Sequence, residues 1–239
     1  MAKSPFLKLL LEEAYVSYFW PMPILECIDI HKSYDELEVL KGINLSIEKA
    51  EIVSIVGRSG AGKTTLLQIL GTLDRPNSGT LKIDRKTAFQ FRDQKLSKFR
   101  NKHIGFIFQF HQLLPEFNAI ENVCIPAYIA GMSKSAAEKR ASELMELLSV
   151  EHRKNHKPSE LSGGEQQRVA VARALVNNPS IVLADEPSGN LDSNTANDLH
   201  ELFFQLRKDL EQTFVIVTHN KELANMADRM LTISDGKII

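Results

Sequence analysis

The sequence has little cysteine and no long apolar segment. Its two cysteines, Cys27 and Cys124, are far apart and form no C-x-x-C pair, so neither a disulfide framework nor a cysteine-based metal site is expected. This usage suits a reducing compartment. No run reaches the roughly 18 uncharged apolar residues that a membrane-spanning helix needs. If a membrane is involved, we therefore expect other chains to span it.

An excess of charge of either sign is also lacking. The 29 Lys and Arg residues face 30 Asp and Glu residues, which gives a formal net charge of −1. Nucleic acid is therefore not an expected partner. At 239 residues, the chain is long enough for one large domain or for a core with a smaller lobe.

The stretch 1–23 differs in composition from the rest. Its segment from Phe6 to Leu11 resembles the start of a signal peptide, but two glutamates interrupt it and no small-residue cleavage site follows. Because Met22 falls just before the first strand-like run, we interpret this stretch as an upstream extension due to start-codon choice. The alternative is an amphipathic helix that docks on a partner. A single domain is expected over 24–239.

A glycine-rich loop follows the apolar run Ile52–Val56 and precedes another apolar segment. It fits the phosphate-loop pattern G-x-x-x-x-G-K-[ST] at every fixed position. A strand, a glycine turn and a helix N-terminus direct backbone N–H groups at one anion, so phosphate is the expected ligand. The predicted binding residues are Gly57, Arg58, Ser59, Gly60, Ala61, Gly62, Lys63, Thr64 and Thr65.

Three side chains of this loop have separate expected roles. Lys63 should reach the β and γ phosphates, the Thr64 hydroxyl should ligate the accompanying Mg²⁺, and Thr65 is a weaker candidate for a further phosphate contact. The alternative is a glycine turn without a ligand. A hydrolase nucleophile elbow would require glycine where Ala61 stands, so that interpretation fails.

Hydrophobic patterning predicts an α/β fold. The runs Ile24–Ile30 and Ile43–Ile47 alternate as half-buried antiparallel strands do, whereas Ile52–Val56 is almost continuously apolar, as in a strand buried on both faces. The second half alternates helices with the strands Ile181–Asp185 and Phe214–Thr218, which indicates βαβ units and a mostly parallel sheet.

The region of about 110–160 has a different pattern. Pro115 and Pro126 are expected to break its first part, and Ser133 can cap a helix with an apolar face. We predict a helical subdomain inserted here. Its polar connector contains His152 and His156, which have no third ligand nearby and are interpreted as solvated linker residues.

Two carboxylates follow a buried strand. Asp185 would hold Mg²⁺, and Glu186 would polarise the attacking water as general base. Gln109 and Thr218 also stand at predicted strand ends, where ligands gather in such sheets. The alternative is an ordinary turn after a strand.

The run L-S-G-G-E-Q contains a capping box. Ser162 precedes Glu165 by three residues, and a helix follows. The box does not explain Gly163 and Gly164, because glycine weakens a helix by up to about 1 kcal/mol each. A second phosphate-facing helix N-terminus would explain them.

Together, these motifs resemble those of the ATP-binding cassette (ABC) ATPase family over roughly residues 24–239. The run L-S-G-G-E-Q is the most specific of them, since many NTPases share the phosphate loop. The resemblance implies a P-loop NTPase fold with an antiparallel β subdomain and an inserted helical subdomain, and ATP and Mg²⁺ as ligands. It also implies head-to-tail pairing of two copies, with ATP on one loop closed over by the L-S-G-G-E-Q of the other.

The resemblance assigns further roles by position. Ser162, Gly163 and Gly164 would face the γ-phosphate in trans, and His219 would hold it. Gln109 would link Mg²⁺ and water to a transmembrane partner. Asp192 would lie in the loop that connects the two sites. Tyr34 stands where the family's adenine-stacking aromatic does, although it could be a plain strand-edge tyrosine.

A finer resemblance is to the ATPases of lipoprotein-releasing systems. It depends on Thr72–Pro76, Phe108–Phe117, Glu121–Val123 and the S-G-N-L-D loop at 188–192. It implies an ATPase homodimer on the cytoplasmic side of the inner membrane, bound peripherally to transmembrane permease subunits that meet the stretch after Gln109. The alternatives are the ATPase of a macrolide or peptide exporter and a cell-division regulatory ATPase.

Overall fold

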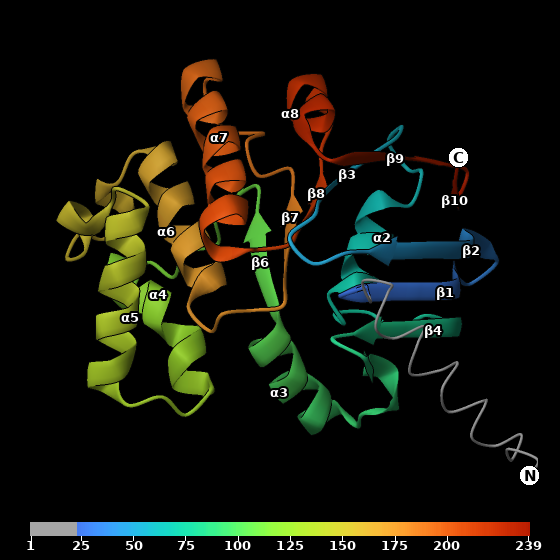
Figure 1. Ribbon diagram of the computed structural model, residues 1–239, viewed down its shortest axis with the longest axis horizontal. Helices are drawn as coiled ribbons and strands as arrows, with labels where there is room; N and C mark the ends of the chain where they lie inside the picture. Colours follow the sequence, from blue (N-terminus) through green and yellow to red (C-terminus); the bar gives the residue numbers. More distant parts are fainter. Residues whose placement is uncertain (1–22) are drawn as a thin grey trace, which may run out of the picture.

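The computed structural model describes residues 23–239, so the predicted N-terminal extension lies outside the described residues but for its last one. Its centre is a six-stranded sheet (Figure 1). In sheet order, the strands are β10 (Lys237–Ile238), β9 (Arg229–Ser234), β3 (Ile52–Val56), β8 (Phe214–Val217), β7 (Ile181–Asp185) and β6 (Ile104–Phe108). All neighbours are parallel except β10 and β9. The predicted mostly parallel core is confirmed.

A second, antiparallel sheet contains the N-terminal strands. Its order is β2 (Leu37–Ile47), β1 (Leu25–Tyr34), β4 (Ser78–Ile83) and β5 (Lys86–Thr87). Simple alternation along β1 would turn Asp29 inward. Instead, Asp29 has a φ of 50° at a register shift, so that Ile30 is buried together with Cys27. A β-bulge thus keeps the charged residue out of the core.

Side chains cap most helices at their N-termini. The helices are α2 (Lys63–Leu70), α3 (Asp93–His103), α4 (Ala119–Ile129), α5 (Lys134–Leu147), α6 (Gly163–Leu175), α7 (Ser193–Leu210) and α8 (Lys221–Met226), with short 3₁₀ turns η1 (Ala88–Gln90), η2 (Glu151–Arg153) and η3 (Pro158–Glu160). The predicted caps Ser133 and Ser162 are confirmed.

The expectation that Pro126 breaks the chain is wrong. Pro126 lies inside α4. Its carbonyl oxygen accepts hydrogen bonds from the side-chain amides of Asn101 (3.1 Å) and Asn177 (3.0 Å). The helix also buries an apolar face that includes Val123 and Ala127. Tertiary packing therefore outweighs the local cost of the proline.

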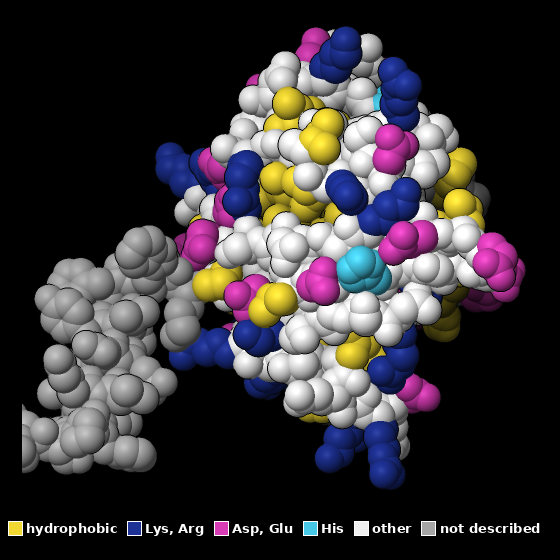
Figure 2. All heavy atoms as spheres, turned by 90° about the vertical axis from the view of Figure 1, so that its right-hand side faces the viewer, with side chains coloured by type: hydrophobic (Ala, Val, Ile, Leu, Met, Phe, Trp, Pro, Cys, Tyr) yellow, Lys and Arg dark blue, Asp and Glu magenta, His cyan; other side chains and the backbone are white. Residues whose placement is uncertain are grey.

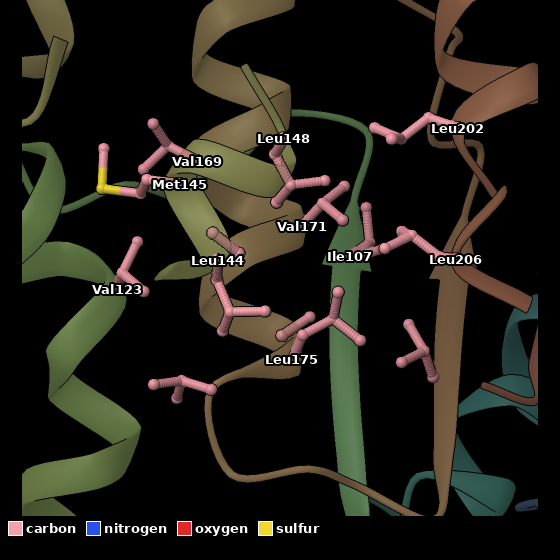
Figure 3. Close-up of a cluster of buried hydrophobic side chains, with 14 of the residues drawn as sticks. Ile107, Val123, Leu144, Met145, Leu148, Val169, Val171, Leu175, Leu202 and Leu206 are labelled. Atoms are coloured by element: carbon pink, nitrogen blue, oxygen red, sulfur yellow. The ribbon is translucent and has the colours of Figure 1, made fainter. Parts of the chain in front are cut away.

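Two hydrophobic cores lie on opposite faces of the parallel sheet. One joins the sheet to α4, α5, α6 and α7, and Figure 3 shows Val171 and Leu206 on either side of Ile107 of β6, with Leu144 beyond Val171. The other joins the sheet to α2 and the antiparallel sheet. Neighbouring residues of one strand serve different cores, as Ile52 and Val53 do. This explains why the central strands are apolar along most of their length.

The surface agrees with the balanced composition. On the face drawn in Figure 2, basic and acidic side chains are interspersed. Among residues 23–239, no helix is both long and apolar enough to cross a bilayer.

Candidate functional site

The glycine loop leads from β3 into α2, as predicted. Helix α2 begins at Lys63 with no side-chain cap, because its N-cap is Gly62 with a φ of 104°. A Cβ on Gly62 would come within 2.8 Å of Leu40, and one on Gly57 would fall on the Ile233 carbonyl oxygen. The first-turn N–H groups of α2 thus have no cap partner and are available to an anion.

Lys63 lies folded over this loop. Its Nζ donates to the carbonyl oxygens of Gly57 (2.9 Å) and Arg58 (3.0 Å). The Thr64 side chain next to it is exposed. A positive charge and a free hydroxyl therefore stand at the mouth of the loop.

Asp185 lies at the carboxyl end of β7, between Phe108 of β6 and Val217 of β8. Burial raises its pKa, the negative charge of Glu186 raises it further, and the positive charge of Lys63 opposes both. A half-buried carboxylate beside a second carboxylate favours a bound cation. The structure thus brings Lys63, Asp185 and Glu186 together, although they come from distant parts of the sequence.

Glu186 and His219 form a contacting pair. Glu186 has a left-handed φ of 47°, and its N–H donates to the Val217 carbonyl oxygen at 2.9 Å. Its Oε2 accepts a hydrogen bond from the His219 N–H (3.1 Å) and lies 2.8 Å from His219 Nδ1. Since the His219 side chain is 74% exposed, its ring is free to meet a ligand.

Gln109 follows β6 and has a partner that sequence reasoning missed. Its Nε2 donates to Asn190 Oδ1, and Asn190 Nδ2 donates back to the Gln109 carbonyl oxygen, each at 3.1 Å. The Gln109 side chain also lies against Gly189, where a Cβ would be 2.8 Å from Nε2. The S-G-N-L-D loop therefore holds Gln109. The only hint of this contact in the sequence was the polar side chain of Asn190 within the S-G-N-L-D loop.

Of the two glycines of L-S-G-G-E-Q, Gly164 has a steric reason within the chain, whereas a Cβ on Gly163 would make only an ordinary contact. A Cβ on Gly164 would lie 2.5 Å from the methyl carbon of Thr195 in α7, and one on Gly163 would lie 3.5 Å from Leu191. Asp192 caps α7 by accepting hydrogen bonds from Asn194 N and Thr195 N, both at 3.1 Å. Close packing of α6 on α7 thus accounts for Gly164 without a phosphate.

The structure does not bring Ser162, Gly163 or Gly164 to the glycine loop of the same chain. Helix α6 packs on β6 together with α4, α5 and α7, whereas α2 packs on the other side of the sheet, toward β2 (Figure 1).

Tyr34 ends β1 and is held by two further side chains. Its hydroxyl donates to Asp74 Oδ2 at 2.7 Å. Lys32 Nζ lies 4.7 Å from the centre of its ring and donates to Asp74 Oδ1 at 2.8 Å. The pKa of Tyr34 is raised, first because of the hydrogen bond to Asp74. With a cation near one side and 43% exposure, the ring can accept a flat ligand.

The donors fit ATP with a hard divalent cation. The glycine loop offers N–H groups and Lys63, while the Thr64 hydroxyl, the Gln109 amide oxygen and Asp185 are oxygen ligands of the kind that Mg²⁺ takes. No group of three or more His, Cys, Asp or Glu side chains with metal-site geometry occurs within residues 23–239. A magnesium site here would therefore depend on the phosphates as well.

Comparison with known proteins gives consistent results. Residues 40–189 match the family model described as "ABC transporter". The lipoprotein-releasing system ATP-binding protein LolD of Bacteroides thetaiotaomicron is 61% identical over 87% of this chain and 96% of its own length. LolD of Porphyromonas gingivalis is 59% identical over 89% and 97%.

Solved structures agree with these sequence matches. A dimeric post-hydrolysis structure of the ATP-binding cassette MJ0796, bound to ADP and Pi, matches with a TM-score of 0.81 and 40% identity, over 90% of this chain and 96% of that one. Since the family model covers more than half of the sequence and the LolD matches span nearly the whole of those proteins, the chain belongs to the ABC transporter family, among its LolD-type ATP-binding proteins.

Proposed function

We propose that the chain is the ATP-hydrolysing subunit of an ABC transporter complex that releases lipoproteins from the inner membrane. The observation that supports it most is the convergence of Lys63, Asp185 and the Glu186–His219 pair at one edge of the sheet. The cargo follows from the 61% identity to a LolD protein.

The residues divide the reaction among them. Lys63 and the α2 N-terminus hold the phosphates, and Tyr34 stacks on the adenine. Glu186 accepts a proton from the attacking water, and His219 contacts the γ-phosphate and holds the Glu186 carboxylate in place. Thr64, Gln109 and Asp185 would hold Mg²⁺. The cation would neutralise charge that develops on the phosphates.

We also propose that the site is completed by a second copy. Ser162, Gly163 and Gly164 lie on the side of the sheet away from their own glycine loop, so they can close only over the ATP of another chain. Two observations support this arrangement. The resemblance to ABC ATPases implies head-to-tail pairing of two copies, and the matching cassette MJ0796 has a dimeric structure.

Transmembrane permease subunits are the proposed partners of the stretch after Gln109. This stretch exposes Phe110 (74%), Leu114 (44%) and Phe117 (40%), and such apolar exposure suits a protein partner. Peripheral binding on the cytoplasmic side of the inner membrane would follow. Residues 24–239 would act as one ATPase domain, with a helical subdomain at about 110–160.

Glu186→Gln tests the hydrolytic assignment. The variant should keep ATP binding, lose turnover by about 100-fold or more because it lacks the general base, and accumulate an ATP-bound dimer. ATPase assays and light scattering after size exclusion measure both. Glu201→Gln, an exposed carboxylate on α7, is the matched control. Retained turnover in Glu186→Gln would remove Glu186 from its role.

A further inference from the structure

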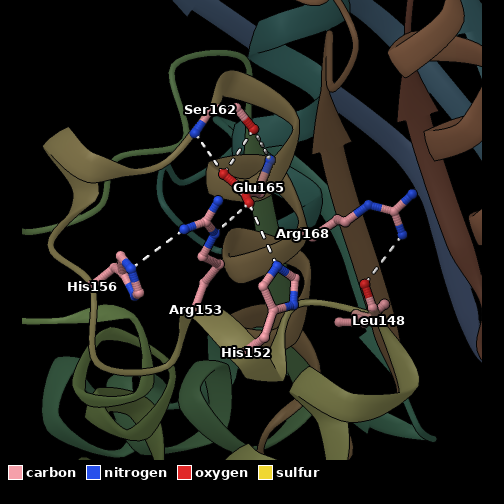
Figure 4. A network of polar contacts seen from close by, with 7 residues as sticks. All are labelled: Leu148, His152, Arg153, His156, Ser162, Glu165 and Arg168. Atoms are coloured by element: carbon pink, nitrogen blue, oxygen red, sulfur yellow. Dashed lines mark hydrogen bonds and ion pairs between the residues drawn. The ribbon is translucent and has the colours of Figure 1, made fainter.

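The carboxylate of Glu165 joins the N-terminus of α6 to the turn η2. Its Oε2 accepts hydrogen bonds from the Ser162 N–H (2.8 Å) and the Ser162 hydroxyl (2.9 Å). Its Oε1 accepts from Arg153 Nε at 2.7 Å and lies 3.8 Å from His152 Nε2 (Figure 4). Ser162 is thus bound to a carboxylate whose other oxygen is occupied by an arginine.

Glu165 is negatively charged near neutral pH. The Ser162 N–H, and after it Arg153, lower its pKa to about 2, although partial burial opposes them. If the proposed function holds, the γ-phosphate of ATP bound to a second copy must approach Ser162. An uncompensated carboxylate at this place would repel that phosphate.

Arg153 supplies the positive charge beside the Glu165 carboxylate. Its N–H donates to the Val150 carbonyl oxygen (3.0 Å), its own carbonyl oxygen accepts from the His156 N–H (2.9 Å), and its Nη1 lies 3.3 Å from His156 Nε2. The interpretation of His156 as a solvated linker residue is therefore wrong, because its side chain is half-buried, with a buried Nδ1, and contacts Arg153. Arg168, three residues beyond Glu165, donates to the Leu148 carbonyl oxygen instead.

We propose that Arg153 is a positioning residue for ATP-driven closure of two copies. It neutralises Glu165 and keeps that carboxylate on the Ser162 N–H, so that the N-terminus of α6 can receive the phosphate bound to a second copy. This role rests on the proposed function, since it presumes the ATP-bound dimer.

The test uses the Glu186→Gln chain as parent and measures the ATP concentration that gives half-maximal dimer in sedimentation experiments. Adding Arg153→Met should raise this concentration about tenfold or more, because Glu165 then lacks the permanent positive charge of the guanidinium. Adding Glu165→Gln as well should restore it to within about twofold, since glutamine keeps the capping box without the charge.

Two controls separate this role from a general structural one. Lys154→Met removes a positive charge from the neighbouring position, where Lys154 pairs with Glu151, and should leave dimer formation unchanged. Binding of a fluorescent ADP to the monomer should be equal in all variants, because α6 does not contact the bound nucleotide of its own chain.

The possible outcomes are distinct. A parent that stays monomeric with ATP would overturn the proposed dimer and this inference with it. If the parent dimerises, then normal dimer formation in Arg153→Met, or no recovery on adding Glu165→Gln, would overturn the role of Arg153 alone.

Discussion

Among single residues, Tyr34 gives the sharpest test of nucleotide recognition. Tyr34→Ala should weaken ATP binding about tenfold, since stacking on a base contributes about 1 to 3 kcal/mol. Binding of tripolyphosphate, which has no base, should not change. Calorimetry with both ligands measures the difference. Tyr34→Phe is the control, because it keeps the ring and loses only the bond to Asp74. An equal loss for both ligands would argue against stacking.

Lys63 allows the complementary test, in which the binding of phosphate and not of the base should change. Lys63→Ala should weaken ATP and tripolyphosphate alike, because it removes charge-assisted hydrogen bonds of about 1.5 to 3 kcal/mol each. The same calorimetric titrations with ATP and tripolyphosphate measure both affinities. Unchanged affinity for either ligand would contradict the phosphate assignment.

Glu165 should link stability to pH. Its pKa in the folded chain, about 2, lies below the ordinary 4.5, so its contribution to stability is present above pH 4.5 and is lost as the pH falls toward 2. Wild type should therefore exceed Glu165→Gln by about 1 to 2 kcal/mol in free energy of unfolding near neutral pH. The gap should close in acid. Urea titrations at several pH values measure it, and a constant gap would contradict the assignment.

Residue types proved easier to predict from sequence than their partners. The motifs single out Lys63, Asp185 and Glu186 as candidates, because few side-chain types suit a phosphate or cation site, and the structure brings these three together. The contacts that orient the site, such as Asn190 on Gln109 and Asp74 on Tyr34, join positions 81 and 40 residues apart. No local pattern records such distant pairs.

Between elements, the contact of α6 with α7 is testable at Gly164. Gly164→Ala should destabilise the chain by about 1 to 3 kcal/mol, because its Cβ would overlap the Thr195 methyl group. Adding Thr195→Ser removes that methyl group but keeps the hydroxyl that donates to Asp192 Oδ2 at 2.6 Å, so it should recover most of the loss. Thermal unfolding of both single variants and the double variant measures this. Absence of recovery would locate the cost elsewhere.

Helices and strands with a clear hydrophobic pattern were predicted well from the sequence, but the irregularities within them were not. The parallel strands and the capped helices follow from apolar runs and from Ser133 and Ser162. The bulge at Asp29 and the helical Pro126 depend on what packs against them, so sequence alone predicted a regular strand and a break.

Across the whole molecule, the surface that follows Gln109 should separate hydrolysis from coupling. Phe110→Ser should leave the ATPase rate of the isolated chain within about twofold, because an exposed side chain adds little to stability. It should reduce the amount of membrane subunits that co-purify with the chain. Leu37→Ser is the matched control, since Leu37 is 67% exposed on β2, within the other sheet. Undiminished co-purification of Phe110→Ser would exclude Phe110 from the contact.

The strand order has a consequence for the order of events during synthesis. Strand β3, which leads into the glycine loop, lies between β8 and β9, and both come from the last 30 or so residues of the chain. A growing chain therefore exposes β3 without a neighbour on either edge until these two later strands have been made. A chain that lacks β8 and β9 should therefore have no ordered glycine loop with which to hold nucleotide. Nucleotide binding thus cannot assist the early steps of folding. Unfinished copies are thereby kept from occupying a place in an ATP-driven pair.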